Sequence, residues 1–107
     1  MNFSDLGKMK QMLSQAQAMQ SEMEQKLSET VVEAATGGGV VTVRMNGRKE
    51  ILRLKIAPTA MGSTPEDLEL LEDLITAAIN EAGRRADAAM KSSVAGMMSG
   101  LNLPGLE

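Results

Sequence analysis

An apolar repeat in the first quarter of the chain is the feature that most constrains its fold. Over residues 4–29 the apolar side chains recur at alternating intervals of three and four positions, with Gln20 as a polar break. This spacing places them on one stripe of an α-helix. Ser4 is suited to cap that helix, and Asp5 lies in its first turn, where the helix dipole favours a carboxylate. A helix of this extent is roughly 36 Å long.

We expect this stripe to form the seam of a dimer. Positions with this spacing are more often part of a core or a helix seam than an adaptable groove for another protein. The groove stays open as an alternative, since methionine side chains repack readily. The predicted seam consists of Leu6, Met9, Met12, Leu13, Ala16, Met19, Met23 and Leu27.

Residues 30–57 have the pattern of three short strands. The first runs from Thr30 to Ala35 and is broken by three glycines at 37–39. The second and third, residues 40–45 and 48–57, flank Asn46-Gly47. An Asn-Gly pair between β-type runs predicts a hairpin closed by a two-residue type I′ turn.

That turn fixes a register and two faces for the hairpin. With Asn46 and Gly47 as the turn residues, Val41 lies opposite Leu52 and Val43 opposite Glu50. Alternation then separates an apolar face from a basic one, and we expect the apolar face to pack on the helices. The apolar face holds Val41, Val43, Met45, Leu52, Leu54 and Ile56. The basic face holds Val40, Thr42, Arg44, Lys49, Ile51, Arg53 and Lys55.

A second long helix follows the strands. Pro58 ends the third strand, and Thr64 as N-cap with Pro65 at the first helical position marks the helix start. We expect this helix to end near Ser92 or Ser93. One domain would then cover residues 1–93. Residues 94–107, which are rich in glycine, methionine and serine, would form a flexible C-terminal tail.

The predicted architecture is therefore α+β, in the order α-β-β-β-α, with two long helices and a three-stranded antiparallel sheet. Strands of six residues run only roughly 20 Å, so the first helix is longer than the sheet. The part of its apolar stripe that extends beyond the sheet is most simply buried against the same stripe of a second copy of the chain. We therefore predict a homodimer with helices that project from a shared β core.

The composition excludes several kinds of chemistry. The chain has no Cys and no His, which excludes disulfides, thiolate catalysis and zinc fingers and removes the commonest general base. Without Trp or Tyr it lacks the usual side chains for stacking bases. We therefore predict no enzyme activity, cofactor, metal site or small-molecule substrate. No apolar run reaches about 18 residues and the first residues do not have a signal-peptide pattern, so we expect a cytoplasmic protein without a membrane partner.

Four segments occur in a specific order. They are the opening Met-, Gln- and Lys-rich helix, the run 40–47 with its Asn-Gly pair, the strand end at 54–58, and the helix segment 71–82. Over about residues 5–92 this order resembles the YbaB/EbfC family of nucleoid-associated proteins. In that family an Asp usually precedes the proline, whereas this chain has Ala57. The resemblance implies a tweezers-like homodimer in the bacterial cytoplasm or nucleoid. It also implies binding of double-stranded DNA with low sequence preference, which alters the conformation of the DNA.

The positive charge needed to bind DNA is localised. The net charge is −3, yet residues 36–57 are basic and both flanks are acidic. One candidate DNA-binding group is the sheet set, Arg44, Lys49, Arg53 and Lys55. The other is the helix set, Lys8, Lys10, Arg84, Arg85 and Lys91.

Each group also has a structural explanation. The sheet cations could solvate a face or protect an edge against aggregation. The cations late in the second helix could complement its dipole. The alternative function is a protein-interaction adaptor that uses the Met-rich helices, with DNA binding weak or lost.

Overall fold

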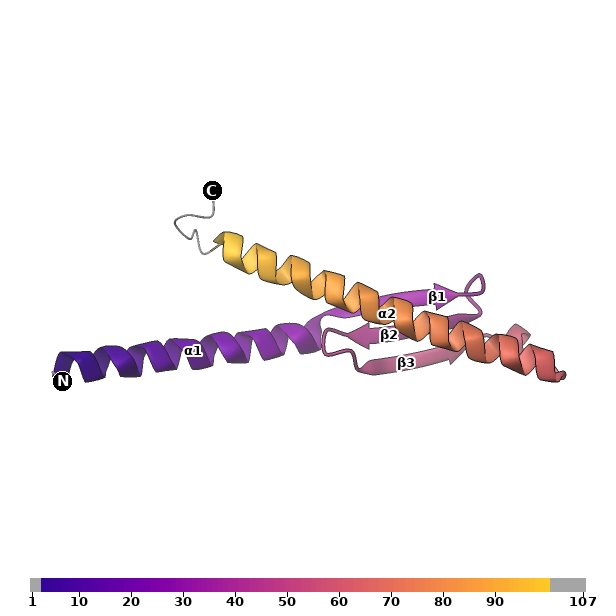
Figure 1. Cartoon of the computed structure of the whole chain (residues 1–107), viewed down its shortest axis with the longest axis horizontal. Helices are drawn as coiled ribbons and strands as arrows, with labels where there is room; N and C mark the ends of the chain where they lie inside the picture. Colours follow the sequence, from indigo (N-terminus) through magenta and orange to yellow (C-terminus); the bar gives the residue numbers. More distant parts are fainter. Residues whose placement is uncertain (1–2, 101–107) are drawn as a thin grey trace.

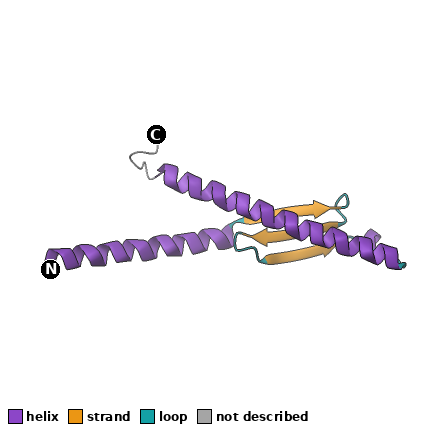
Figure 2. Cartoon of the chain, in the orientation of Figure 1, coloured by secondary structure: helices purple, strands orange, loops and turns teal. Residues whose placement is uncertain are grey.

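The computed structural model describes residues 3–100 and has the predicted order of elements (Figure 1). A helix is followed by three strands, a 3-10 turn and a second helix, which confirms the α+β class (Figure 2). The strands form one antiparallel sheet in the order β1-β2-β3. The elements are α1 (Phe3–Glu29), β1 (Val31–Thr36), β2 (Val41–Asn46), β3 (Ile51–Ile56), η1 (Pro58–Ala60) and α2 (Pro65–Gly100).

The start of α2 is fixed by the residues that the sequence indicated. The backbone N–H of Asp67 donates to Thr64 Oγ1 at 3.1 Å, and the backbone N–H of Thr64 donates to Asp67 Oδ2 at 3.3 Å. This reciprocal pair has the geometry of a capping box, and Pro65 occupies the first helical position.

The predicted end of α2 was wrong. The helix continues through Ser92 and Ser93 to Gly100, so the first half of the predicted tail is helical. Serine is only a mildly unfavourable helix residue, and a single glycine such as Gly96 costs about 1 kcal/mol, which is too little to stop a long helix. The rest of the predicted tail, residues 101–107, lies outside the described residues.

The β2–β3 turn also differs from the prediction. It has three residues, Gly47 to Lys49, and not two. The N–H of Asn46 donates to the Glu50 carbonyl at 3.1 Å, and the N–H of Lys49 donates to the Asn46 carbonyl at 3.0 Å. Lys49 has a φ of 64°, as expected for the left-handed residue that follows a type I turn in three-residue hairpins. Asn46 therefore occupies the first position of the turn, where asparagine is favoured.

The Asn46 side chain explains why this longer turn forms. It is 5% exposed and its Oδ1 accepts from the backbone N–H groups of Arg48 and Glu50 at 3.0 and 3.1 Å. Its Nδ2 donates to Glu50 Oε1 at 3.0 Å. Next to it, the N–H of Gly47 donates to the Leu27 carbonyl at 2.8 Å. The turn therefore holds the C-terminal end of α1 against the sheet.

The longer turn changes the register and leaves most residues on their predicted faces. Ile51 is an exception: it was predicted for the basic face, but it pairs with the buried Met45 and therefore lies on the inner face. Val41 pairs with Ile56 and Val43 with Leu54, so the predicted partners Leu52 and Glu50 were wrong. Each partner is displaced by four positions. Because this is an even number, Leu54 and Ile56 keep their place on the apolar face. Leu52 is the extra residue of a bulge where the pairing shifts between Arg44 and Met45.

The core lies between α2 and two of the three strands. Ala78, Ala82 and Ala86 of α2 are fully buried against the inner face of β1 and β2, where small side chains let the helix backbone approach the sheet closely. The Thr36 hydroxyl ties β1 to α2 by donating to the Leu74 carbonyl at 2.7 Å. The buried sheet residues are Ala34, Val41, Val43 and Met45. Val40, predicted for the basic face, precedes β2 and packs half-buried against this core.

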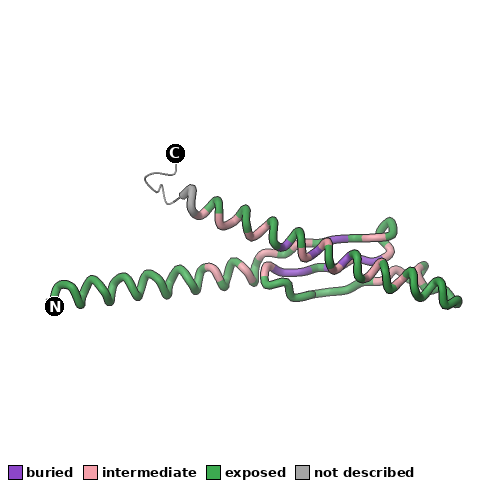
Figure 3. The backbone as a smooth tube through the Cα atoms, viewed as in Figure 1, coloured by how far each residue is buried: buried purple, intermediate pink, exposed green. Residues whose placement is uncertain are grey.

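β3 and α1 remain largely uncovered. Leu54 belongs to the inner face of the sheet by register, yet it is 41% exposed because α2 lies over β1 and β2 (Figure 3). No residue of α1 is buried. The helix extends from one end of the sheet, and the C-terminal half of α2 leaves from the same end (Figure 1). The long axis of the chain measures 75 Å.

We predict that Asn46→Ala destabilises the fold by about 2 kcal/mol. The substitution removes the acceptor for two backbone N–H groups at a nearly buried position. Urea denaturation measures the change in the free energy of unfolding. Arg48→Ala, at an exposed position of the same turn, is the matched control and should change it by less than about 0.5 kcal/mol. Equal stabilities of the two variants would contradict the proposed role of Asn46.

Candidate nucleic-acid interface

The outer face of the sheet carries a cluster of cations. Alternation along the strands places Arg44, Arg53 and Lys55 on the face opposite the one that α2 covers. Arg44 lies directly opposite Arg53, and Thr42 lies opposite Lys55. These four residues and Glu33 of β1 line one shallow hollow. The outer face thus brings three positive side chains and a hydroxyl together around a common surface.

Lys49 does not belong to this cluster. It lies in the β2–β3 turn, and its Nζ forms a 2.9 Å ion pair with Asp87 Oδ2 of α2. The predicted two-residue turn would have placed Lys49 in β3, whereas the three-residue turn moves it off the strand. The sheet set therefore contains three of the four predicted residues, Arg44, Arg53 and Lys55.

The helix cations are dispersed, and two of them are ion-paired. Arg84 contacts Glu81 Oε2 through Nη2 at 2.8 Å, and Arg85 contacts Glu81 Oε1 through Nε at 3.3 Å. Arg85 also donates to the backbone carbonyl of Glu33 at 2.7 Å. Hydrogen bonds from Arg84 and then Arg85 lower the pKa of the Glu81 carboxyl. Glu81 therefore remains ionised beside both arginines.

The three predicted helix lysines are exposed. Lys8 and Lys10 lie on α1 and Lys91 lies on α2, so the fold does not gather them on one element. Within residues 3–97, whose side chains the structure describes, no ion pair joins Lys8, Lys10, Lys91, Arg44, Arg53 or Lys55 to an acidic group. All nine predicted cations are accessible, but their local electrostatic surroundings differ.

Glu81 is a residue that the sequence analysis missed. It stands three and four positions before Arg84 and Arg85, the spacing at which side chains on one helix form ion pairs. That spacing was visible in the sequence, and it would have separated these arginines from the unpaired cations.

The predicted seam residues are on the surface of the single chain. Met12 and Leu13 are 68% and 61% exposed, whereas only Met23 and Leu27, close to the sheet, are half-buried. The chain by itself leaves the stripe exposed from Leu6 to Met19. Its placement is what a seam with a second polypeptide requires.

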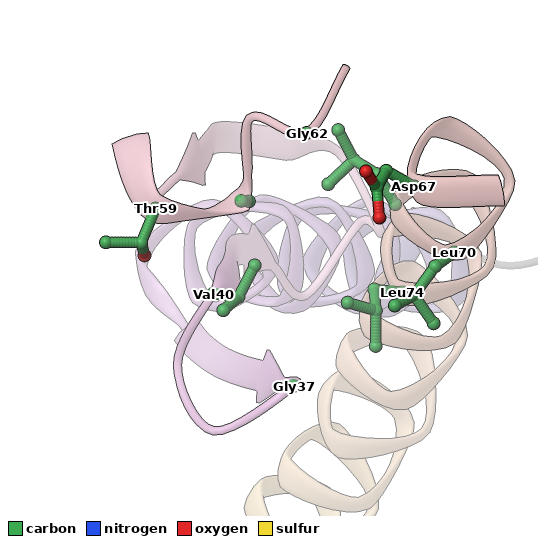
Figure 4. Close-up of a pocket in the computed structure, with 9 residues that line it drawn as sticks. Gly37, Val40, Thr59, Gly62, Asp67, Leu70 and Leu74 are labelled. Atoms are coloured by element: carbon green, nitrogen blue, oxygen red, sulfur yellow. The ribbon is translucent and has the colours of Figure 1, made fainter. Parts of the chain in front are cut away.

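A second hollow, near the start of α2, is mainly apolar. Val40 and Leu74 point into it between the β1–β2 loop and the segment after β3 (Figure 4). Asp67, the acidic side chain among its lining residues, already accepts the Thr64 N–H of the helix cap. Gly37 has a φ of 64°, and a Cβ there would lie 2.9 Å from Leu74 Cδ1. The hollow lies where loops pack on the helix, and its lining includes the side chains of Thr59 and Asp67 among mainly apolar residues.

Two further observations concern the described residues. Among them, no three His, Cys, Asp or Glu side chains are grouped so that they could hold a metal ion. None of the helices in this part of the chain combines the length and apolarity needed to cross a membrane.

Comparison with known proteins decides the family. Residues 6–101 match the profile of the YbaB/EbfC DNA-binding family. The chain belongs to this family. Family membership confirms the predicted class, a nucleoid-associated DNA-binding protein, and does not favour the adaptor alternative.

Relatives of this YbaB/EbfC chain match over nearly its whole length. A nucleoid-associated protein from Acidobacterium capsulatum is 61% identical over 101 residues, covering 91% of this chain and 93% of the relative. Another from Koribacter versatilis is 48% identical over 95 residues, covering 89% and 92%. The crystal structure of an uncharacterized protein from Helicobacter pylori matches with a TM-score of 0.67 at 28% identity, covering 92% of this chain and 98% of that one.

We predict that the pKa of the Glu81 carboxyl is below the ordinary value of glutamate and that Arg84→Gln/Arg85→Gln raises its titration midpoint. The lowered pKa means that the ion pairs stabilise the fold above the unfolded-state pKa, and that this contribution is lost as the pH falls through the folded-state value. Side-chain carboxyl NMR measures the midpoint. An unchanged midpoint in the double variant would show that the arginines do not perturb Glu81.

Proposed function

We propose that this chain binds double-stranded DNA as a homodimer and contacts mainly phosphates, with little preference for base sequence. The observation that supports the dimer is the apolar stripe of α1, because this helix of 27 residues has no buried side chain. Monomeric proteins rarely expose a continuous apolar surface of that length. A second copy offers an identical stripe, and a two-fold dimer covers both at once.

The inner face of β3 supports the same proposal. Leu54 is substantially exposed next to a core formed by the same face of the sheet. A second subunit that covers β3 would complete the core that α2 leaves open. These two apolar surfaces lie on the inner face of the sheet and along α1, while the cations Arg44, Arg53 and Lys55 occupy the outer face.

The mode of DNA binding follows from the residues available. Lys and Arg side chains neutralise phosphates and release counterions, a contribution that does not depend on base sequence. The chain has no Trp or Tyr for stacking on bases. A dimer presents every basic group twice, and two separated contacts on one body constrain the path of the duplex between them. We therefore propose roles in nucleoid organisation, gene regulation and DNA protection, carried out in the cytoplasm at the nucleoid.

We predict a dimeric mass in solution that depends on the α1 stripe. Leu13→Glu places a charge in the proposed seam and should shift the protein towards monomer, as measured by sedimentation or light scattering. Gln11→Glu makes the same change in charge on the opposite side of α1 and should leave the mass unchanged. A stable wild-type monomer at micromolar concentration would contradict the proposed dimer.

We predict that gel shifts with a mixed-sequence duplex show retardation that falls steeply with salt. Six or more phosphate contacts would lower the affinity by about a thousandfold between about 50 and 200 mM salt. Duplexes of unrelated sequence should bind with similar affinity. Absence of retardation of any duplex at low salt, with the dimer confirmed to be folded, would contradict the proposal.

A further inference from the structure

We propose that the outer face of the sheet, through Arg44, Arg53 and Lys55, is the surface on which the DNA phosphates lie, in preference to the arginines of α2. This inference rests on the proposed function and specifies where the same DNA is held. It follows from which cations are unpaired, from how they are arranged, and from which surfaces remain open once the apolar faces are covered.

The cations of the outer face lie next to one another on two neighbouring strands. Arg44 and Arg53 face each other on neighbouring strands, and Lys55 stands two residues from Arg53 on the same face. Like charges directly opposite each other in an antiparallel pair destabilise a sheet. No described acidic group forms an ion pair with any of the three. An anion between them therefore removes a repulsion as well as adding a contact.

These cations line a hollow that contains a further hydrogen-bond donor. The Thr42 hydroxyl lies opposite Lys55 in the same hollow, so the site offers guanidinium, ammonium and hydroxyl donors together. Arginine side chains bind phosphate oxygens in a bidentate manner. The Glu33 carboxylate also borders the hollow, opposite Arg44. Its negative charge offsets one of the three cations, so an excess of positive charge remains.

The arginines of α2 differ from those of the sheet because they are ion-paired. Arg84 and Arg85 share the Glu81 carboxylate, and Arg85 also donates to a backbone carbonyl. A phosphate that approaches these arginines meets an ionised carboxylate and competes with existing hydrogen bonds. Similarly, Lys49 is held by Asp87. The sheet cations also have a carboxylate nearby, that of Glu33, but no described acidic group forms an ion pair with them.

The outer face of the sheet remains accessible in the proposed dimer. The surfaces that need a second copy are the α1 stripe and the inner face of β3, because both expose apolar side chains. The outer face of β2 and β3 carries Thr42, Arg44, Arg53 and Lys55, and α2 does not cover it. A dimer built on the apolar surfaces leaves the outer face of both subunits open to a duplex.

The test compares two matched triple variants of the full chain. The sheet variant is Arg44→Gln/Arg53→Gln/Lys55→Gln, and the helix variant is Arg84→Gln/Arg85→Gln/Lys91→Gln. Each removes two arginines and one lysine at exposed positions, so each changes the net charge equally. Gel shifts or fluorescence anisotropy with a mixed-sequence duplex at several salt concentrations give the affinity and its salt slope. Circular dichroism and sedimentation confirm folding and mass.

We expect the sheet variant to bind about tenfold or more weakly at low salt. Its salt slope should become shallower by about 1 for each phosphate that the variant no longer neutralises. The helix variant should change affinity by less than about threefold, because the charges that it removes lie away from the proposed phosphate site and salt screens their effect there. The variant Arg44→Lys/Arg53→Lys/Lys55→Arg keeps all three positive charges and should therefore have most of the wild-type salt slope.

Several outcomes would overturn the inference. A sheet variant that binds as wild type would overturn it, and so would equally weakened binding in both variants, because this reports net charge alone. A sheet variant that becomes monomeric would identify the outer face as a subunit interface instead. Failure of the wild-type protein to bind any duplex would remove the proposed function itself, whereas the other outcomes leave DNA binding intact.

Stability provides a second readout, independent of DNA. Without DNA, Arg53→Gln should raise the melting temperature by about 1–5 °C, because it relieves the repulsion with Arg44. Arg48→Gln, in the neighbouring turn, is the control and should leave it unchanged. A lower melting temperature for Arg53→Gln would show that the cluster serves the stability of the sheet and would count against a phosphate site.

Discussion

The contact between the alanine face of α2 and two strands of the sheet determines what the rest of this molecule can do. Ala78, Ala82 and Ala86 bring the helix close to β1 and β2, and no comparable contact covers β3. The inner face of the sheet is thereby divided into a core under α2, formed by β1 and β2, and an exposed apolar part on β3. The other face is left to water, and it is there that the cations gather.

The β2–β3 turn has a structural role beyond closing a hairpin. Its Asn46 side chain binds backbone groups of the turn, while Gly47 binds the last turn of α1 through the Leu27 carbonyl. A Cβ at Gly47 would lie 2.9 Å from that carbonyl oxygen and 2.7 Å from Met90 Sδ. A glycine is therefore required for α1, the sheet and α2 to meet. The direction in which α1 leaves the sheet depends on this junction.

The acidic balance of the chain is compatible with DNA binding because the charges are separated in space. Carboxylates crowd the first half of α2, and Glu81 and Asp87 further along it pair with Arg84, Arg85 and Lys49. The outer face of the sheet has a local excess of positive charge despite a net charge of −3. Phosphates respond to this local field, which salt screens over about 10 Å or less at physiological ionic strength.

The sequence by itself determined the order of elements, the start of α2 and most of the two faces of the sheet, although Val40, Lys49 and Ile51 do not lie on the predicted basic face. Helical spacing, the Thr64-Pro65 cap and strand alternation are local properties, so neighbouring residues suffice to reveal them. The turn of the hairpin, its register and the end of α2 were decided by the tertiary structure. Asn46 selects the longer turn because its side chain and Gly47 find partners in Glu50 and in α1. Which cations are unpaired likewise depends on contacts such as Lys49 with Asp87, 38 residues apart in the chain and joined only by folding.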